Sequence, residues 1–224
     1  MTNRVDFDEY TSYYNQLLQE RTGFFSENDA YFAKYKVELM KSRLTHPVKR
    51  ILEYGCGIGR NIPFIRQAFP YADVVGTDIS HASLEMARRD QPDVEFMAED
   101  EASDIGQFDL IFVAGVYHHI PVRERSLVSN LLYQRMNPSG NLFVFEHNPY
   151  NPVTRSIVSN CPYDDDAVLL QPKELRQYLA QAGFCNARSE YCLFVPPSFK
   201  RLKWLESCLG WLPLGGQYFV HVSK

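Results

Sequence analysis

No apolar stretch of this chain reaches the roughly 20 residues that a membrane-spanning helix needs. The first ten residues also lack the apolar core of a signal peptide, so we expect a cytoplasmic protein without a stable membrane anchor. The five cysteines are scattered and form no C-x-x-C pair, which argues against a disulfide framework or a zinc site and favours reduced thiols.

Positive charge is in deficit, with 23 Lys and Arg against 27 Asp and Glu, for a net charge of −4. A protein that binds nucleic acid by neutralising phosphates is usually basic, so no nucleic-acid partner is expected. Internal repeats and low-complexity linkers are also missing. A length of 224 residues with 45% hydrophobic content is therefore typical of one globular domain with a sizeable core.

The most informative stretch runs from residue 48 to residue 60. A short apolar strand pattern is followed by Gly55, Gly57 and Gly59, and then by the pattern of an amphipathic helix. Glycines between a strand and a helix allow a tight turn whose backbone N–H groups can approach a ligand. A dinucleotide fingerprint needs a third small residue where Arg60 stands, so this stretch disfavours a nicotinamide-dependent oxidoreductase.

Strand and helix patterns then alternate in a regular way, which predicts an α/β protein with a mostly parallel sheet. The fourth strand is almost continuously apolar, as expected of a central strand covered on both faces. Further strands are predicted at 72–78, 94–98, 108–114, 141–146, 187–195 and 217–222, and helices at 81–89, 122–135, 172–182 and 198–209. The second strand ends at Asp78, at about the spacing from the glycines of a carboxylate that accepts hydrogen bonds from ribose hydroxyls.

Residues 9–44 precede the first strand and are predicted to be helical. Two aromatic stripes support either a cover for the sheet edge or a lid over a binding cleft, where aromatic faces would suit a cation. The stripes consist of Tyr10, Tyr13, Tyr14, Leu17 and Leu18, and of Tyr31, Phe32, Tyr35, Leu39 and Met40.

These motifs occur in the order and spacing of a known family. Glu53, the glycines, Asp78, Asp100 and the strand that begins at Phe108 together resemble the class I S-adenosylmethionine (SAM) dependent methyltransferases. The resemblance covers about two-thirds of the chain and is greatest to small-molecule enzymes related to those of ubiquinone and menaquinone biosynthesis. It implies a Rossmann-like, seven-stranded sheet of order 3-2-1-4-5-7-6 with an antiparallel last strand. A helical cap (1–46), a SAM-binding core (47–146) and a substrate-side insert with a C-terminal hairpin (147–224) would then form a single domain.

The resemblance also implies which residues bind the cofactor. Asp78 would hold the ribose, Ile79 would pack on the adenine, and an acid after the third strand would bind the adenine amino group. The register favours Asp100 for this last role, with its neighbour Glu99 as the alternative. The full predicted set is Glu53, Gly55, Cys56, Gly57, Asp78, Ile79, Glu99, Asp100 and Ala114.

Three histidines are candidates for catalysis: His118, His119 and His147. A base is needed only if the acceptor must lose a proton, as a hydroxyl or an activated carbon would. His119 matches a recurrent histidine of the family and has an alternative role as a structural residue beneath the cofactor. His147 follows the fifth strand, on the expected acceptor side, and is the preferred base. The spacing of these residues does not indicate a metal site.

We therefore expect methyl transfer from SAM to a small-molecule acceptor, through a hydroxyl or an activated carbon. The insert after strand five and the ending 212–218 resemble a bacterial subgroup associated with polysaccharide or secondary-metabolite clusters. Two alternatives remain open: a SAM-binding regulatory or partner protein without catalysis, and an enzyme that uses SAM for chemistry other than methyl transfer.

Overall fold

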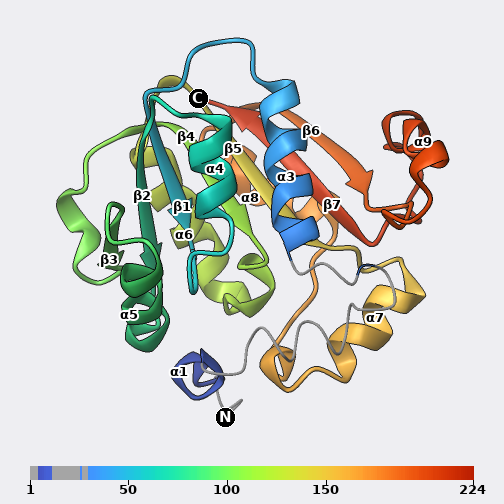
Figure 1. The fold of residues 1–224 in the computed structure, drawn as a ribbon, viewed down its shortest axis with the longest axis horizontal. Helices are drawn as coiled ribbons and strands as arrows, with labels where there is room; N and C mark the ends of the chain where they lie inside the picture. Colours follow the sequence, from blue (N-terminus) through green and yellow to red (C-terminus); the bar gives the residue numbers. More distant parts are fainter. Residues whose placement is uncertain (1–4, 12–25, 27–29) are drawn as a thin grey trace.

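A single seven-stranded sheet forms the centre of the molecule in the computed structural model, which describes residues 5–11, 26 and 30–224 (Figure 1). The strand order is β3-β2-β1-β4-β5-β7-β6, which confirms the order implied by the family resemblance. The strands are β1 (Arg50–Tyr54), β2 (Asp73–Asp78), β3 (Glu95–Ala98), β4 (Phe108–Ala114), β5 (Met136–His147), β6 (Cys185–Cys192) and β7 (Gln217–Ser223).

All pairings among β1 to β5 are parallel, and β7 runs antiparallel to both β5 and β6. The chain moves outward from β1 to β2 and β3, and then crosses to β4 on the other side of β1. The strand order therefore reverses between β1 and β4. In open α/β sheets, ligands bind beyond the carboxyl ends of the strands at such a point.

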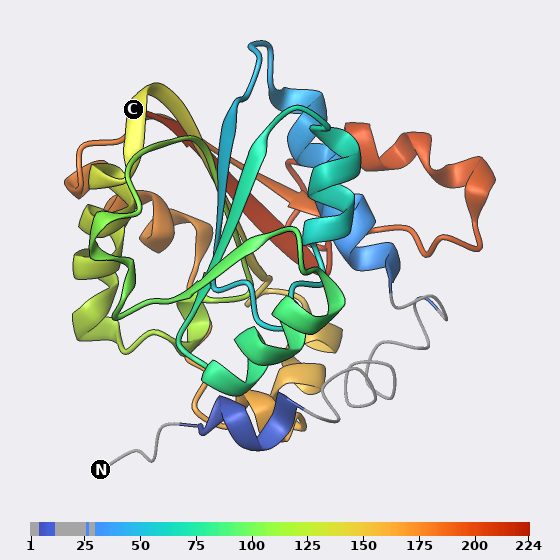
Figure 2. The same ribbon diagram turned by 60° about the vertical axis from the view of Figure 1, so that its left-hand side comes forward.

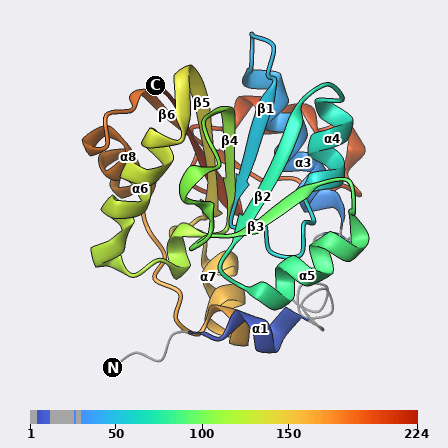
Figure 3. The ribbon, with the colours of Figure 1, turned by 90° about the vertical axis from the view of Figure 1, so that its left-hand side faces the viewer.

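Helices cover both faces of this sheet and its carboxyl edge. The α3, α4 and α5 helices lie on one face and α6 and α8 on the other, as the side view shows (Figure 3). The short α1 and α7 helices lie below the carboxyl ends of the strands in all three views (Figures 1 to 3). The helices are α1 (Phe7–Tyr10), α3 (Ala30–Arg43), α4 (Ile62–Ala68), α5 (His81–Asp90), α6 (Arg125–Gln134), α7 (Pro152–Ser159), α8 (Pro172–Gln181) and α9 (Trp204–Cys208).

Alternation along β4 explains why both faces need a cover. Leu110 and Phe112 pack with the α3, α4 and α5 side, whereas Ile111 and Val113 pack with the α6 and α8 side. All four side chains are fully buried. Burying a large apolar side chain contributes about 1.5–3 kcal/mol, so the two layers of helices are bound to the sheet mainly by apolar contact.

Local signals fix several helix ends. The Ser80 hydroxyl accepts a hydrogen bond from the Ser83 N–H at 3.0 Å and thereby caps α5. Pro172 occupies the first turn of α8, and Gly183 follows that helix with a φ of 107°, a conformation that favours glycine. These helices therefore begin and end close to the predicted residues.

Two segments differ from the sequence prediction. β5 begins at Met136, five residues before the predicted start at 141, because the pairing of β4 with β5 shifts register between Phe108 and Leu110 and absorbs the extra residues. The predicted helix at 198–209 is a 3-10 turn over Lys200–Leu202 followed by the short α9. Four residues of the predicted N-terminal stripe lie outside the described residues: Tyr13, Tyr14, Leu17 and Leu18. Among the helices that the structure describes, none is long and apolar enough to span a bilayer.

His221 on β7 gives the fold a pH-dependent contribution to stability. Its ring stacks on Phe143 at 4.1 Å between centroids, and its Nε2 lies 2.8 Å from Asn141 Oδ1. Burial, together with Arg188 and Arg43, lowers the pKa of His221 from 6.5 to about 4. The unfolded chain takes up this proton first, so the stabilisation is complete above about pH 6.5 and is lost as the pH falls towards 4.

We expect the His221→Phe variant to show a weaker pH dependence of the free energy of unfolding, because phenylalanine keeps the stacking and cannot titrate. The difference between pH 7 and pH 4.5 should shrink by about 1–2 kcal/mol, a figure reduced for the partial exposure of the ring. Urea denaturation at the two pH values measures it. An equal pH dependence in both proteins would contradict the assignment.

Candidate functional site

A cavity of about 420 Å³ opens at the carboxyl edge of the sheet. Its wall includes the residues that end β1, β2, β4 and β5, among them Gly55, Asp78, Ala114 and His147. Side chains from α1, α3 and the segment after α7 complete it. The cavity therefore lies at the reversal of strand order, where the topology favours ligand binding.

The glycine turn forms the floor of this cavity. Gly55 N–H and Cys56 N–H both donate to the Thr77 carbonyl, at 2.8 and 2.9 Å, which ties the turn to β2. Gly55 has a φ of 70°, and a Cβ there would collide with the Val116 side chain. Gly57 has a φ of 53°, and a Cβ there would point into open space. No side chain therefore separates the backbone of Gly57 from the cavity, so a ligand can approach this backbone closely.

Asp78 closes the other side of the turn. Its carboxylate accepts hydrogen bonds from Gly57 N–H at 2.7 Å and from Ser80 N–H at 2.9 Å. Burial raises the pKa of Asp78, while these backbone N–H groups lower it. Each carboxylate oxygen can accept a further bond, so Asp78 can also receive hydroxyl donors of a ligand. Ile79 follows on the wall, with 49% of its surface exposed.

The structure brings Glu99, rather than Asp100, to the cavity. β3 ends at Ala98, and Glu99 N–H donates to the Asp78 carbonyl at 3.0 Å, which draws Glu99 beside β2. Glu99 lines the cavity and forms an ion pair with Arg135 at 2.7 Å. Asp100 is exposed in the following turn and is not part of the wall. The register argument for Asp100 is therefore not supported by its position.

An acidic and a basic side chain, Glu53 and Lys36, lie near the glycine turn. Glu53 is buried behind the wall, where its Oε1 accepts from Asn61 Nδ2 at 2.6 Å and its Oε2 has no hydrogen-bond partner among the described residues. Burial raises the pKa of Glu53 to about 8. Lys36, on the cavity wall, comes from α3, and burial lowers its pKa to about 8 although Glu53 opposes this shift.

Lys36 was not predicted from the sequence, although a signal was present. It lies four residues after Phe32 and three after Ala33, on the side of α3 that faces the molecule. A lysine on an otherwise apolar helix face is unusual, because burying its charge is unfavourable unless a partner is present.

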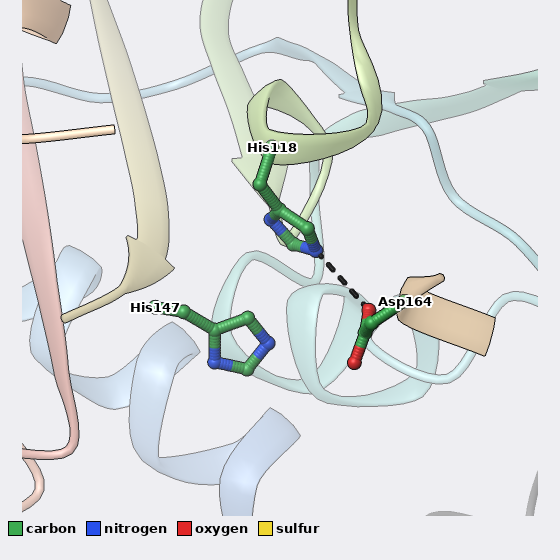
Figure 4. A group of neighbouring side chains, drawn as sticks. All are labelled: His118, His147 and Asp164. Atoms are coloured by element: carbon green, nitrogen blue, oxygen red, sulfur yellow. Dashed lines mark ion pairs between the residues drawn. The ribbon is translucent and has the colours of Figure 1, made fainter. Parts of the chain in front are cut away.

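A cluster of histidines and acids occupies the opposite end of the cavity. His118 is buried in the 3-10 turn Tyr117–His119, with its Nδ1 2.6 Å from Glu146 Oε2 and its Nε2 3.5 Å from Asp164 Oδ1. Figure 4 shows His118 and His147 both facing Asp164. The His118 and His147 ring centroids are 4.9 Å apart.

Electrostatics differ strongly between these two histidines. Burial alone would lower the pKa of His118, but the carboxylates of Glu146 and Asp164 raise it to about 10. Burial and the neighbouring His118 lower the pKa of His147 to about 4. His147 is therefore neutral at pH 7 and a weak base.

His119 has a different environment. Its Nδ1 lies 3.0 Å from Asp166 Oδ1, while its Nε2 has no hydrogen-bond partner among the described residues and lies 3.4 Å from Asp164 Oδ1. The Phe7 ring packs edge-on against the His119 ring, with centroids 5.1 Å apart. A carboxylate therefore faces each nitrogen of the His119 ring, with Asp166 at the shorter distance.

Asp164 and Asp166 belong to a run of three consecutive acids at 164–166, for which the sequence alone indicates no role. They lie between α7 and α8, and nothing in their spacing indicates that they reach the histidines. The segment that carries them folds back below the carboxyl ends of β4 and β5, which brings acids and histidines from three parts of the chain together.

Comparison with known sequences identifies the family. The family described as "Methyltransferase domain" matches residues 14–188, well over half of the chain. This chain belongs to the methyltransferase family. S-adenosylmethionine is accordingly its cofactor, as the glycine turn and Asp78 indicated.

Known relatives of this methyltransferase cover only part of it. A trans-aconitate 2-methyltransferase of Deinococcus radiodurans is 32% identical over 99 residues, which are 44% of this chain and 38% of the relative. The chain thus spans less than half the length of that relative.

Solved structures share the fold of this methyltransferase over nearly its whole length. A SAM-dependent methyltransferase from Archaeoglobus fulgidus has a TM-score of 0.70 at 15% identity and covers 95% of this chain and 100% of its own. Human N-acetylserotonin methyltransferase in complex with SAM has a TM-score of 0.66 at 16% identity, over 99% of this chain and 63% of its own.

The cavity of the methyltransferase fits the cofactor on structural grounds. Gly57 leaves open space where a side chain would stand, and Asp78 offers oxygens with remaining acceptor capacity beside it. The buried Glu53 Oε2 and the Lys36 amine provide a hydrogen-bonding acid and base near the same turn. A ligand with ribose hydroxyls and a charged amino-acid end suits this set of donors and acceptors.

We expect Asp78→Ala to weaken the binding of S-adenosylhomocysteine by about tenfold or more, because hydrogen bonds to a charged group contribute about 1.5–3 kcal/mol. Asp78→Asn should have a smaller effect, since it keeps an acceptor for the Gly57 N–H. Calorimetric titration measures both, with the exposed Asp104→Ala as the matched control. Unchanged affinity in a folded Asp78→Ala protein would show that another acid holds the ribose.

Proposed function

We propose that this methyltransferase methylates a hydroxyl oxygen of a small-molecule acceptor, with His119 as the general base. The observation that carries this proposal is the pairing of His119 Nδ1 with Asp166 on the cavity wall, because a carboxylate at one ring nitrogen stabilises the imidazolium that forms when the other accepts a proton. An acceptor that loses no proton would not need such a pair. His147, the base preferred from the sequence, is supported less well because its pKa is lowered to about 4.

The cavity divides into a cofactor side and an acceptor side. On the cofactor side, Asp78 would hold the ribose, and Ile79 with Glu99 would contact the adenine. The methionine end would lie towards Lys36 and Glu53, with its carboxylate near the Lys36 amine and its ammonium near the Glu53 carboxyl group. The histidines and the segment after α7 would then face the acceptor.

When bound, SAM supplies a methyl group made electrophilic by its sulfonium sulfur. The chain holds the acceptor oxygen in line and removes its proton to His119 Nε2, and Asp166 stabilises the imidazolium that forms. Positioning alone can contribute on the order of 7–11 kcal/mol. The base adds about 10²–10⁴ in rate.

The parts of the single domain follow from this division. We propose a helical cap (1–46), a SAM-binding core (47–146) and a substrate-side insert with the C-terminal hairpin (147–224).

The thiols Cys56 and Cys192 are free and buried, which supports the reducing cytoplasm as the location of the protein. The net charge of −4 favours a small acceptor over a nucleic acid.

Two measurements test this function. SAM and S-adenosylhomocysteine should raise the melting temperature of the purified protein, because both would bind the native state only. Release of S-adenosylhomocysteine should then follow the addition of one class in a panel of sugars, quinols and phenols. Binding without turnover on any acceptor would favour a non-catalytic SAM-binding protein, and a folded protein that binds neither ligand would remove the proposal.

A further inference from the structure

Three side chains from distant segments converge on the acceptor side of the cavity. His118 follows β4, His147 ends β5, and Asp164 lies after α7. Each offers one donor atom, and these atoms all lie within 4.8 Å of one another, the only such group in the described part of the chain (Figure 4). We propose that His118, His147 and Asp164 bind a divalent transition-metal ion.

The donor set favours a particular class of metal. Two imidazoles and one carboxylate suit Zn²⁺, Fe²⁺ or Mn²⁺, whereas Mg²⁺ and Ca²⁺ prefer oxygen donors alone. His118 Nε2 and Asp164 Oδ1 are 3.5 Å apart, close to the spacing of about 3.0–3.4 Å between neighbouring ligands held about 2.1 Å from one ion. A small inward movement of the His147 ring would complete the set.

The surroundings of His118 match those of a metal ligand. Its Nδ1 pairs with Glu146 Oε2 at 2.6 Å, and Glu146 is itself fully buried. Ligating histidines commonly donate their second nitrogen to a carboxylate in this way, which orients the ring and strengthens the ligand. Here the pairing turns Nε2 of His118 towards Asp164.

Charge points to the same conclusion. Two carboxylates, Glu146 and Asp164, lie on opposite sides of the His118 ring in a buried place. A divalent cation bound at His118 Nε2 would lie beside the Asp164 carboxylate and would place positive charge among these acids.

A metal ion here would also restrict which acceptors fit the cavity. This extension rests on the proposed function. Three protein ligands leave coordination positions open, and the site lies on the wall of the cavity. An acceptor that presents a hydroxyl beside a second oxygen could occupy them, and the ion would lower the pKa of that hydroxyl. His119, which is not one of the three ligands, would still receive the proton.

Metal binding can be tested without knowledge of the acceptor. The full chain is treated with a chelator and titrated with Co²⁺, followed by visible absorption and calorimetry, and the metal content of untreated protein is measured by mass spectrometry. We expect one Co²⁺ per chain. His147→Ala and Asp164→Asn should each weaken binding by at least roughly tenfold while the protein stays folded by circular dichroism. His46→Ala and His81→Ala replace exposed histidines outside the cavity and should bind as the wild type does.

Two results would overturn the inference. One is the absence of stoichiometric Co²⁺ binding by the folded wild type, which would mean that the contacts of His118 with the two carboxylates hold the cluster together without an ion. The other is equal binding by the wild type and both cavity variants. S-adenosylhomocysteine affinity is measured in parallel on metal-free protein. If it is retained while Co²⁺ fails to bind, the metal inference fails and the methyltransferase proposal stands. If Co²⁺ binds and S-adenosylhomocysteine does not, the methyltransferase proposal fails and the metal inference stands.

Discussion

Replacing Glu146 with alanine is expected to lower the free energy of unfolding by about 3–5 kcal/mol. The Glu146 carboxylate is fully buried and accepts from Val116 N–H at 3.0 Å and from Tyr117 N–H at 2.7 Å. Its other oxygen pairs with His118 Nδ1. Removal would leave two backbone donors and the His118 Nδ1 without partners in a buried place, and each loss is unfavourable. Urea denaturation near pH 7 measures the change.

Two further variants separate this explanation from a general loss of packing. Glu146→Gln keeps an acceptor oxygen for the two backbone N–H groups, so it should destabilise the protein by clearly less than alanine does. Glu38→Ala removes an exposed acid that pairs with Lys34 at 3.8 Å, and it should change stability by no more than about 0.5 kcal/mol. A loss below about 1 kcal/mol in Glu146→Ala would mean that water replaces the carboxylate at little cost.

Replacing His119 with alanine is expected to lower kcat by about 10²–10⁴ once the acceptor is known. The affinity for S-adenosylhomocysteine should stay within about twofold, because the imidazole lies on the acceptor side and acts mainly in the transition state. Asp166→Asn should lower kcat by less, since it weakens the orientation of the ring without removing it. Steady-state kinetics and calorimetry on the same preparations give both quantities.

The outcomes of that experiment distinguish three roles for His119. A loss of kcat with intact cofactor affinity supports the base. A loss of stability or of cofactor affinity supports the structural role that the sequence analysis left open. If kcat stays near that of the wild type, the enzyme works by positioning alone, and the pairing of His119 with Asp166 has another purpose.

The parts of the fold that the sequence predicted well are those set by neighbouring residues. β4 has the predicted bounds because its apolar run stands between turns and is covered on both faces. Asp78 reaches the glycine turn because adjacent parallel strands end at one edge, which the order of motifs already implied. Local periodicity and the family resemblance together therefore predicted the order of the sheet and the position of Asp78 beside the glycine turn.

The acceptor side could not be predicted in the same way. Asp164 and Asp166 meet the histidines only because the segment after β5 folds back, and no local pattern encodes that path. The choice between Glu99 and Asp100 depended on one hydrogen bond, from Glu99 N–H to the Asp78 carbonyl. Such single contacts decide which residue of a turn faces the cavity. The spacing of motifs along the sequence does not predict them.

The position of β7 between β5 and β6 has a consequence for the synthesis of the protein. β5 carries Glu146 and His147, yet its pairing partner on one side consists of residues 217–223, which a ribosome makes after the other six strands. Until they emerge, the nascent chain exposes a long apolar strand edge, which is the kind of surface that promotes aggregation. Slow translation or a stop codon before β7 should therefore yield insoluble chains in which β1 to β4 can already pair.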